Sequence, residues 1–241
     1  MTWFKIGVII PSSNTTVERE FNRAIKEPEV TIHSSRITLR EVTLKGLEEM
    51  ERETERAAME LSTINPDIIA YACTTGSLFK GPNHHIEIKE RIERLVKVKA
   101  VATAGAVIDA FKRLGANKVL IVTPYIDELN TKEKEFLEAH GFKVVSIRGL
   151  GIVDNTVIGS LDPRTAYEAA LNAYNQFGSD FDALFISCTN WRTLEVIGAI
   201  ERRISKPVVS SNSATLWSVL RELGIRVKLN YDLGMLFSDI Q

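Results

Sequence analysis

The sequence predicts an α/β protein made of two similar halves, each a flavodoxin-like or Rossmann-like parallel sheet flanked by helices. Three observations support this prediction. Short apolar runs alternate with amphipathic stretches, the alternation starts again near the middle, and the two cysteines among 241 residues occupy corresponding places. Such alternation is typical of βαβ units, whose parallel strands are buried on both faces. We expect pseudo-twofold symmetry between the halves, with the active site in the cleft between them.

The first half, residues 1–115, contains four predicted strands that alternate with helices. The strand runs are short and apolar, whereas the helical runs carry their charges on one face. Gly115 ends the last helix, as glycine commonly does. In chain order the elements are strand 5–10, helix 15–25, strand 30–37, helix 47–61, strand 66–73, helix 86–95, strand 99–103 and helix 106–115.

The second half, residues 116–224, repeats this order from "KVLIVTP", which matches "KIGVIIP" near the start. Landmarks recur at nearly one offset, which indicates a duplication rather than a short solenoid repeat. The segment 226–232 resembles the opening strand, so we expect 225–241 to return to the first half and complete it. The matched landmarks and their offsets are Pro11 and Pro124 (113), Arg36 and Arg148 (112), Cys73 and Cys188 (115), and Gly115 and Gly224 (109).

Each cysteine stands where a predicted strand ends, Cys73 in "YACTTGS" and Cys188 in "ISCTNWRT". In open parallel sheets, ligands bind beyond the carboxyl ends of the strands. Two facing halves would therefore bring both thiols to opposite sides of one small substrate. Backbone N–H groups at such positions favour thiolate and hold anions. The alternative interpretation is a pair of small buried side chains, because free cysteine is among the most buried residue types.

Neutral hydrogen-bonding residues surround these strand ends. Thr74, Thr75 and Thr189 follow the cysteines and offer hydroxyls to an oxyanion, while Asn14 in "PSSNTT" and Tyr125 in "TPY" are candidates for binding a carboxylate. The alternatives are a helix cap at Asn14 and simple burial of Tyr125. The sequence also leaves open whether "IVDN" supplies Asn155 to the site or forms only a turn.

Composition and spacing exclude several other functions. A net charge of −1 gives no electrostatic reason to expect nucleic-acid binding. The sequence also contains no run of about 18 apolar residues of the kind that predicts a membrane span. No nucleotide-binding fingerprint occurs, and the histidines lack metal-ligand spacing around either cysteine. We expect a cytoplasmic homodimer with free thiols, no metal and no cofactor.

The sequence resembles the maleate cis–trans isomerases, within the superfamily of aspartate/glutamate racemases and arylmalonate decarboxylase. The resemblance spans essentially the whole chain. Racemases of the superfamily typically carry Cys-Asn-Thr where this chain has Cys73-Thr74-Thr75, and arylmalonate decarboxylase lacks the first cysteine. Trp191 departs from the leucine-like residue expected after the second motif. The matching stretches are "IGVIIPSSNTTVEREF", "YACTTGS", "TPYIDELN", "IVDN" and "SCTNWRT".

This resemblance implies cofactor-independent isomerisation of maleate to fumarate through a covalent succinyl-cysteine intermediate. Cys73 would be the nucleophile and Cys188 the proton donor and acceptor. The alternatives are an amino-acid racemase or arylmalonate-type decarboxylase of the same superfamily, and a dicarboxylate-binding module without turnover. The residues implied to hold the small dicarboxylate are Asn14, Thr74, Thr75, Tyr125, Asn155 and Thr189.

Overall fold

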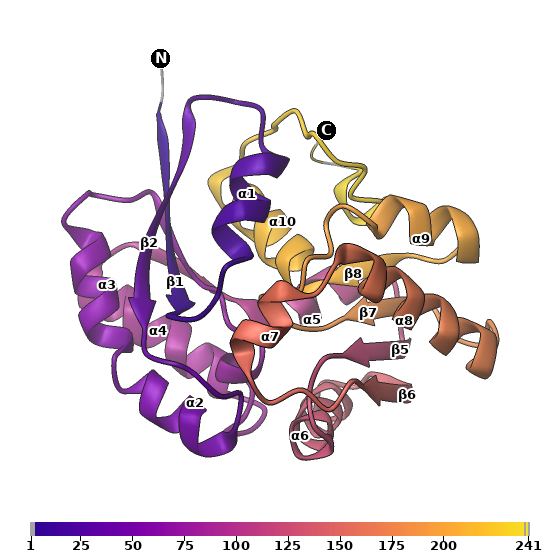
Figure 1. The fold of residues 1–241 in the computed structure, drawn as a ribbon. Helices are drawn as coiled ribbons and strands as arrows, with labels where there is room; N and C mark the ends of the chain where they lie inside the picture. The colour runs from indigo at the N-terminus through magenta and orange to yellow at the C-terminus, as the bar shows by residue number, and fades with distance from the viewer. Residues whose placement is uncertain (1–2, 239, 241) are drawn as a thin grey trace.

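Two four-stranded parallel sheets form the centre of the computed structural model in Figure 1, which describes residues 3–238 and 240. The strand orders, β2-β1-β3-β4 and β6-β5-β7-β8, correspond strand for strand and confirm the predicted α/β class with two similar halves. The strands are β1 (Phe4–Pro11), β2 (Val30–Ile37), β3 (Ile68–Tyr71), β4 (Lys99–Ala102), β5 (Lys118–Thr123), β6 (Lys143–Gly149), β7 (Ala183–Ile186) and β8 (Val208–Ser210).

Helices cover both sheets, and one predicted helix is divided. The expected helix over 47–61 is interrupted at Arg52 and Glu53, because the Glu53 carboxylate accepts a hydrogen bond from Thr38 N at 3.1 Å and holds the turn against the end of β2. The α-helices are α1 (Val17–Ala24), α2 (Leu44–Glu51), α3 (Thr54–Ser62), α4 (His84–Val96), α5 (Thr103–Arg113), α6 (Asp127–Ala139), α7 (Asn155–Ser160), α8 (Pro163–Phe177), α9 (Ile197–Ile204) and α10 (Ser211–Leu223). None of the helices in the described part of the chain combines the length and the apolar character that a membrane span requires.

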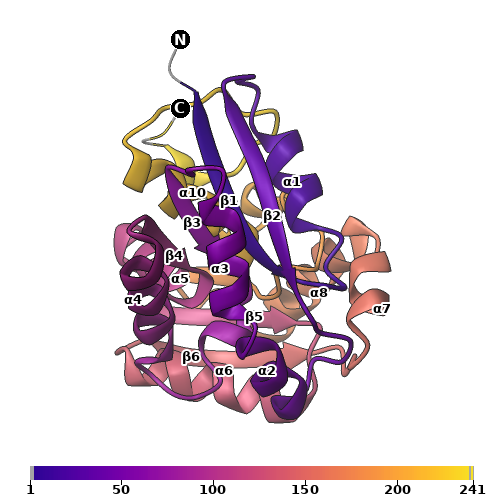
Figure 2. The same ribbon diagram turned by 90° about the vertical axis from the view of Figure 1, so that its left-hand side faces the viewer.

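The two halves meet along α5 and α10, the helices that follow the last strand of each sheet. Thr103 and Thr215 join them through a buried hydroxyl–hydroxyl hydrogen bond of 2.9 Å. Figure 2 shows the long strands β1 and β2 running steeply across the direction of β5 and β6. The carboxyl ends of the strands in both sheets therefore approach the junction between the halves.

The predicted strand over 226–232 does not form. This segment makes one isolated antiparallel bridge, Ile25 to Leu229, beside the end of α1 and away from either sheet edge. Asn230 N donates to Ala24 O at 2.8 Å, whereas Asp232 O accepts from Gly198 N at 3.1 Å. The C-terminal segment thus bonds to both halves. We propose 1–115, completed by 225–241, and 116–224 as the two structural units.

Gly149→Ala should destabilise the fold, because β6 ends where its chain touches the loop carrying Tyr125. A Cβ at Gly149 would lie 2.2 Å from the backbone oxygen of Tyr125 and 2.4 Å from Asn130 Nδ2. We expect a loss of about 1–3 kcal/mol in the free energy of unfolding, measured by urea denaturation. Gly7→Ala is the control, since its Cβ would meet side-chain atoms of Ile69 and Leu61 at 3.2 and 3.3 Å, and it should cost less. Equal stabilities for the two variants would contradict this assignment.

Candidate active site

One pocket between the halves contains both cysteines. Cys73 follows β3 and Cys188 follows β7, so the parallel strands of the two sheets deliver the thiols to a shared space. All eight residues that the sequence suggested for the site lie in its wall, and their individual roles stay predictions. The lining residues are Pro11, Asn14, Leu39, Val42, Cys73, Thr74, Thr75, Tyr125, Asn155, Cys188 and Thr189.

The turn after β3 fixes Cys73. Gly76 N donates to Cys73 Sγ at 3.3 Å, and the Ser77 hydroxyl donates to the backbone oxygen of Cys73 at 2.8 Å. A Cβ at Gly76 would lie 2.8 Å from the sulfur. Glycine is therefore the residue that lets the backbone approach the thiol closely enough to donate a hydrogen bond to it.

Cys188 has an unusual backbone conformation, with φ of 106°. A non-glycine residue there costs on the order of 1–3 kcal/mol, so surrounding contacts must hold it. Cys188 N donates to Ser211 Oγ at 3.0 Å, and Asn190 N donates to Cys188 Sγ at 3.3 Å. Ser211 Oγ also accepts from Thr74 Oγ1 at 2.7 Å, which ties the loops of the two cysteines together. The Tyr125 hydroxyl lowers the pKa of the Cys188 thiol.

The sequence-based expectation that this setting favours thiolate is wrong for the closed pocket. Burial raises the pKa of Cys73 to about 11 and that of Cys188 to about 12, and it outweighs the N–H and hydroxyl donors that lower both values. Only 5% of Cys73 and 4% of Cys188 is exposed, so water does not solvate a sulfur anion here. Both thiols are neutral at pH 7.

Asn14 and Asn155 each combine a structural contact with a place in the pocket. Asn14 Oδ1 accepts from the first turn of α1, from Thr16 N at 2.9 Å and Val17 N at 3.0 Å, while its Nδ2 donates to Thr189 Oγ1 at 3.2 Å. The helix-cap interpretation therefore holds alongside the pocket position. Asn155 Nδ2 donates to Ser13 Oγ at 2.8 Å. Each amide NH₂ has a second hydrogen available for a ligand.

A cover closes the pocket. It consists of residues 39–42 from the first half and 153–155 from the second. Val42 N donates to Val153 O at 2.8 Å and Asn155 N donates to Arg40 O at 3.1 Å, so the two segments pair across the mouth. The cavity that remains beneath them is about 10 Å³, the space of at most one water molecule. The space in this structure is therefore smaller than a four-carbon diacid.

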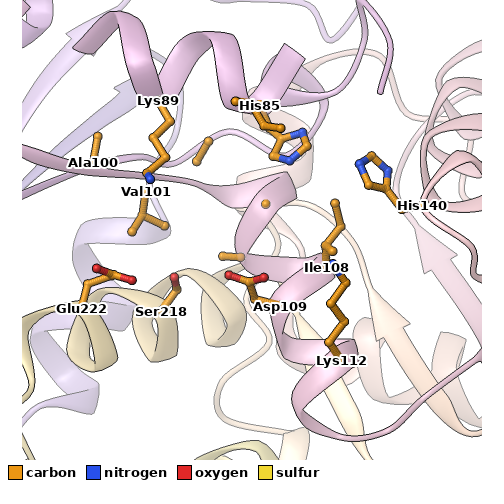
Figure 3. Close-up of a pocket in the computed structure, with 14 residues that line it drawn as sticks. His85, Lys89, Ala100, Val101, Ile108, Asp109, Lys112, His140, Ser218 and Glu222 are labelled. Atoms are coloured by element: carbon orange, nitrogen blue, oxygen red, sulfur yellow. The ribbon is translucent and has the colours of Figure 1, made fainter. Parts of the chain in front are cut away.

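A larger cavity of about 290 Å³ lies elsewhere, between α4, β4, α5 and α10 (Figure 3). Its wall holds no cysteine. Asp109 pairs with Arg221 at 3.3 Å and Glu222 with Lys99 at 3.4 Å, so the acids are already neutralised. Burial lowers the pKa of His85 to about 4, which leaves its imidazole neutral at pH 7. This cavity has the larger volume but lacks the paired cysteines, so the cysteine pocket stays the candidate site.

The sequence analysis missed Asn190 and Ser211. Asn190 Oδ1 accepts from Thr15 N at 2.9 Å and its Nδ2 donates to Asn155 O at 2.7 Å, so one side chain joins three segments around the pocket. Ser211 lies just beyond β8, where the rule that ligands bind at strand ends could have identified it. Among residues 3–238 and 240, no three histidine, cysteine or acidic side chains are grouped to hold a metal ion.

Comparisons with known proteins agree with this site. A model of the arylmalonate decarboxylase family matches residues 6–235. A maleate isomerase of Geobacillus stearothermophilus is 33% identical over 236 residues, covering 92% of this chain and 93% of that protein. The solved maleate isomerase of Pseudomonas putida has a TM-score of 0.92 at 30% identity and covers 99% of both chains. A Nocardia farcinica maleate cis-trans isomerase, a cysteine-to-serine mutant with a covalently bound succinylcysteine intermediate, has a TM-score of 0.86 at 29% identity and covers 94% of this chain and 95% of that chain. The resemblance drawn from the sequence is confirmed.

Alkylation of the ligand-free protein by iodoacetamide should report the raised thiol pKa values. Because only about one Cys73 in 10⁴ is ionised at pH 7, we expect its rate to rise about tenfold per pH unit through pH 10. Peptide mass spectrometry measures each cysteine separately. Tyr125→Phe removes a hydroxyl that lowers the pKa of Cys188 and should slow the alkylation of that cysteine relative to Cys73. A plateau in the rate near pH 7 would contradict neutral resting thiols.

Proposed function

We propose a function from one premise: the chain belongs to the arylmalonate decarboxylase family and matches its maleate isomerases over nearly their whole length. It is an isomerase that converts maleate to fumarate through a covalent cysteine adduct. The observation that carries this proposal is the presence of both thiols in one pocket lined by neutral hydrogen-bond donors. Covalent addition replaces one hard rotation about a double bond by easier steps.

In the first step, the sulfur of Cys73 forms a bond to C2 of maleate as its S–H bond breaks. The π electrons move toward C3, which takes the thiol proton of Cys188, and the proton released by Cys73 restores Cys188. Sulfur and hydrogen thus add across the double bond. The raised pKa of both thiols suits this route, because a resting thiolate would repel the dianionic substrate.

The second step turns the adduct into product. The C2–C3 bond is now single and can rotate. Elimination then reverses the transfers: the C3 proton returns to Cys188, the thiol proton of Cys188 returns to the departing sulfur of Cys73, and the C–S electrons leave with that sulfur as the double bond re-forms. The product is fumarate, and no cofactor takes part.

Neutral donors would hold the two carboxylates throughout. Asn14 and Asn155 would each contribute an amide N–H, and the hydroxyls of Thr74, Thr75 and Thr189 would supply further donors, with Tyr125 beside Cys188. A preorganised donor aimed at developing charge is worth roughly 10²–10³ in rate. Uncharged donors also avoid binding the ground-state dianion more tightly than the transition state.

We further propose that the enzyme works as a homodimer in the cytoplasm. Both cysteines are free thiols, which fits a reducing compartment. Twofold dimers are the commonest soluble oligomers. Sedimentation analysis at several protein concentrations tests the dimer.

Cys73→Ser and Cys188→Ser should separate the two steps. With maleate, proton NMR should show fumarate from the wild-type protein and a loss of at least about 10³-fold in both variants. Intact-mass spectrometry should find a covalent adduct in Cys188→Ser and none in Cys73→Ser. Because the chain has two cysteines, each variant serves as the control for the other. Fumarate formation at the wild-type rate by Cys73→Ser would overturn the mechanism.

A further inference from the structure

A buried carboxylate, Glu20 on α1, contacts the loop that follows Cys188. Its Oε1 accepts from Thr193 N at 2.5 Å and Leu194 N at 2.9 Å, and its Oε2 accepts from Asn212 Nδ2 at 2.6 Å. Only 1% of Glu20 is exposed. All three partners are N–H donors, so an ionised carboxylate is the group that satisfies them together.

Glu20 connects one half of the protein to the other. Glu20 belongs to the first half, whereas Thr193, Leu194 and Asn212 belong to the second half and hold the residues after Cys188. Asn212 Nδ2 also donates to the backbone oxygen of Thr189 at 2.9 Å. The loop is therefore anchored at 189 and at 193–194, on the C-terminal side of a cysteine whose φ of 106° needs external support.

Packing alone does not account for a carboxylate here. Burial raises the pKa of Glu20 to about 7, although its three hydrogen bonds lower it, and nearby Glu195 raises it further. Arg19 and Arg192 lie 3.6 and 3.7 Å from Glu195 and partly offset that charge. Burial of a carboxylate costs desolvation free energy, which an apolar side chain of similar volume would avoid, so stability alone does not favour an acid at this position.

We propose that Glu20 is a positioning residue for Cys188: by holding the 189–194 loop it places the thiol where it can take the proton from C3 as the adduct on Cys73 breaks down. This inference rests on the proposed function. Cys73 is held by hydrogen bonds from Gly76 and Ser77, and neither hydrogen bond involves Glu20. Loss of Glu20 should therefore resemble loss of the Cys188 thiol, in which the adduct is expected to form but not to break down, and should slow the breakdown of the adduct more than its formation.

Glu20→Gln preserves the shape and removes the matched acceptors. If the new amide oxygen faces Thr193 and Leu194, the amide NH₂ meets the NH₂ of Asn212. If Asn212 turns to present its oxygen, which has no other partner among the described residues, the bond to Thr189 O is lost. Either arrangement releases one anchor of the loop. A displacement of about 1 Å at Cys188 is enough to lower the rate roughly 10- to 100-fold.

The test compares Glu20→Gln with Glu201→Gln, a matched control on α9. Glu201 is also a buried acid that accepts backbone N–H groups, from Val208 at 2.8 Å and Met235 at 2.9 Å, but it acts at the opposite end of β8 from the cysteines. With maleate, Glu20→Gln should lower kcat about 10- to 100-fold and accumulate the Cys73 adduct in quenched samples, whereas Glu201→Gln should do neither. Thermal unfolding gives the folded fraction of each variant.

Loss of activity in proportion to the folded fraction, with no excess adduct, would overturn the proposal, as would an unchanged kcat. If Glu20→Gln does not fold, Asn212→Ala removes the link to Thr189 O while leaving the Thr193 and Leu194 bonds of Glu20, and a smaller adduct excess is expected. Absence of fumarate from the wild-type protein would instead refute the proposed function. The alkylation rate of Cys188 relative to Cys73 needs no turnover, so a ratio unchanged by either variant would still count against the positioning role.

Discussion

The exclusion of water from two facing thiols is the constraint on which the rest of this structure depends. A sulfur anion in this pocket would be neither solvated nor paired with a cation, so burial keeps Cys73 and Cys188 protonated. A neutral pair accepts a dianionic diacid without adding a third negative charge. The requirement explains a wall of hydroxyls and amides, because basic side chains would stabilise thiolate and bind the free dianion too strongly.

Closing such a pocket requires that neither half be complete alone. The cover pairs a segment from each half, and Ser211 from the second half accepts from Thr74 in the first. Asn190 adds hydrogen bonds to Thr15 and Asn155, so it also links the two halves beside the pocket. These hydrogen bonds join the halves at the pocket, in addition to the packing of α5 against α10.

Much of this architecture was predictable because parallel strands leave two plain signals in a sequence. Their apolar runs located the eight strands closely, and the rule that strand ends meet placed Asn14 and Tyr125 at the pocket, whereas Asn155 followed only from the family resemblance. The pKa of the cysteines was not predictable, since their burial depends on a cover drawn from both halves. The prediction of a strand at 226–232 was wrong for a related reason. The residue pattern of this segment is typical of a strand, but the chain runs beside the end of α1 and not along the edge of a sheet.

The two matched halves support the two thiols unequally. Glu133 on α6 stands 113 positions after Glu20, the same offset that separates the prolines at the ends of the matched opening motifs, and burial raises the pKa of both acids to about 7. Yet Glu133 accepts only from Ser187 Oγ at 2.6 Å, and its Oε2 has no partner among the described residues. Ser187 belongs to the same half as Glu133, so Glu133 makes no hydrogen bond to the Cys73 loop across the junction. A sulfur that binds carbon and then leaves must follow the adduct as it rotates, whereas a proton donor must stay aimed at one atom. Of the two matched acids, only Glu20 hydrogen-bonds across the junction, and its contacts lie on the side of Cys188, where a fixed position matters for the proposed chemistry.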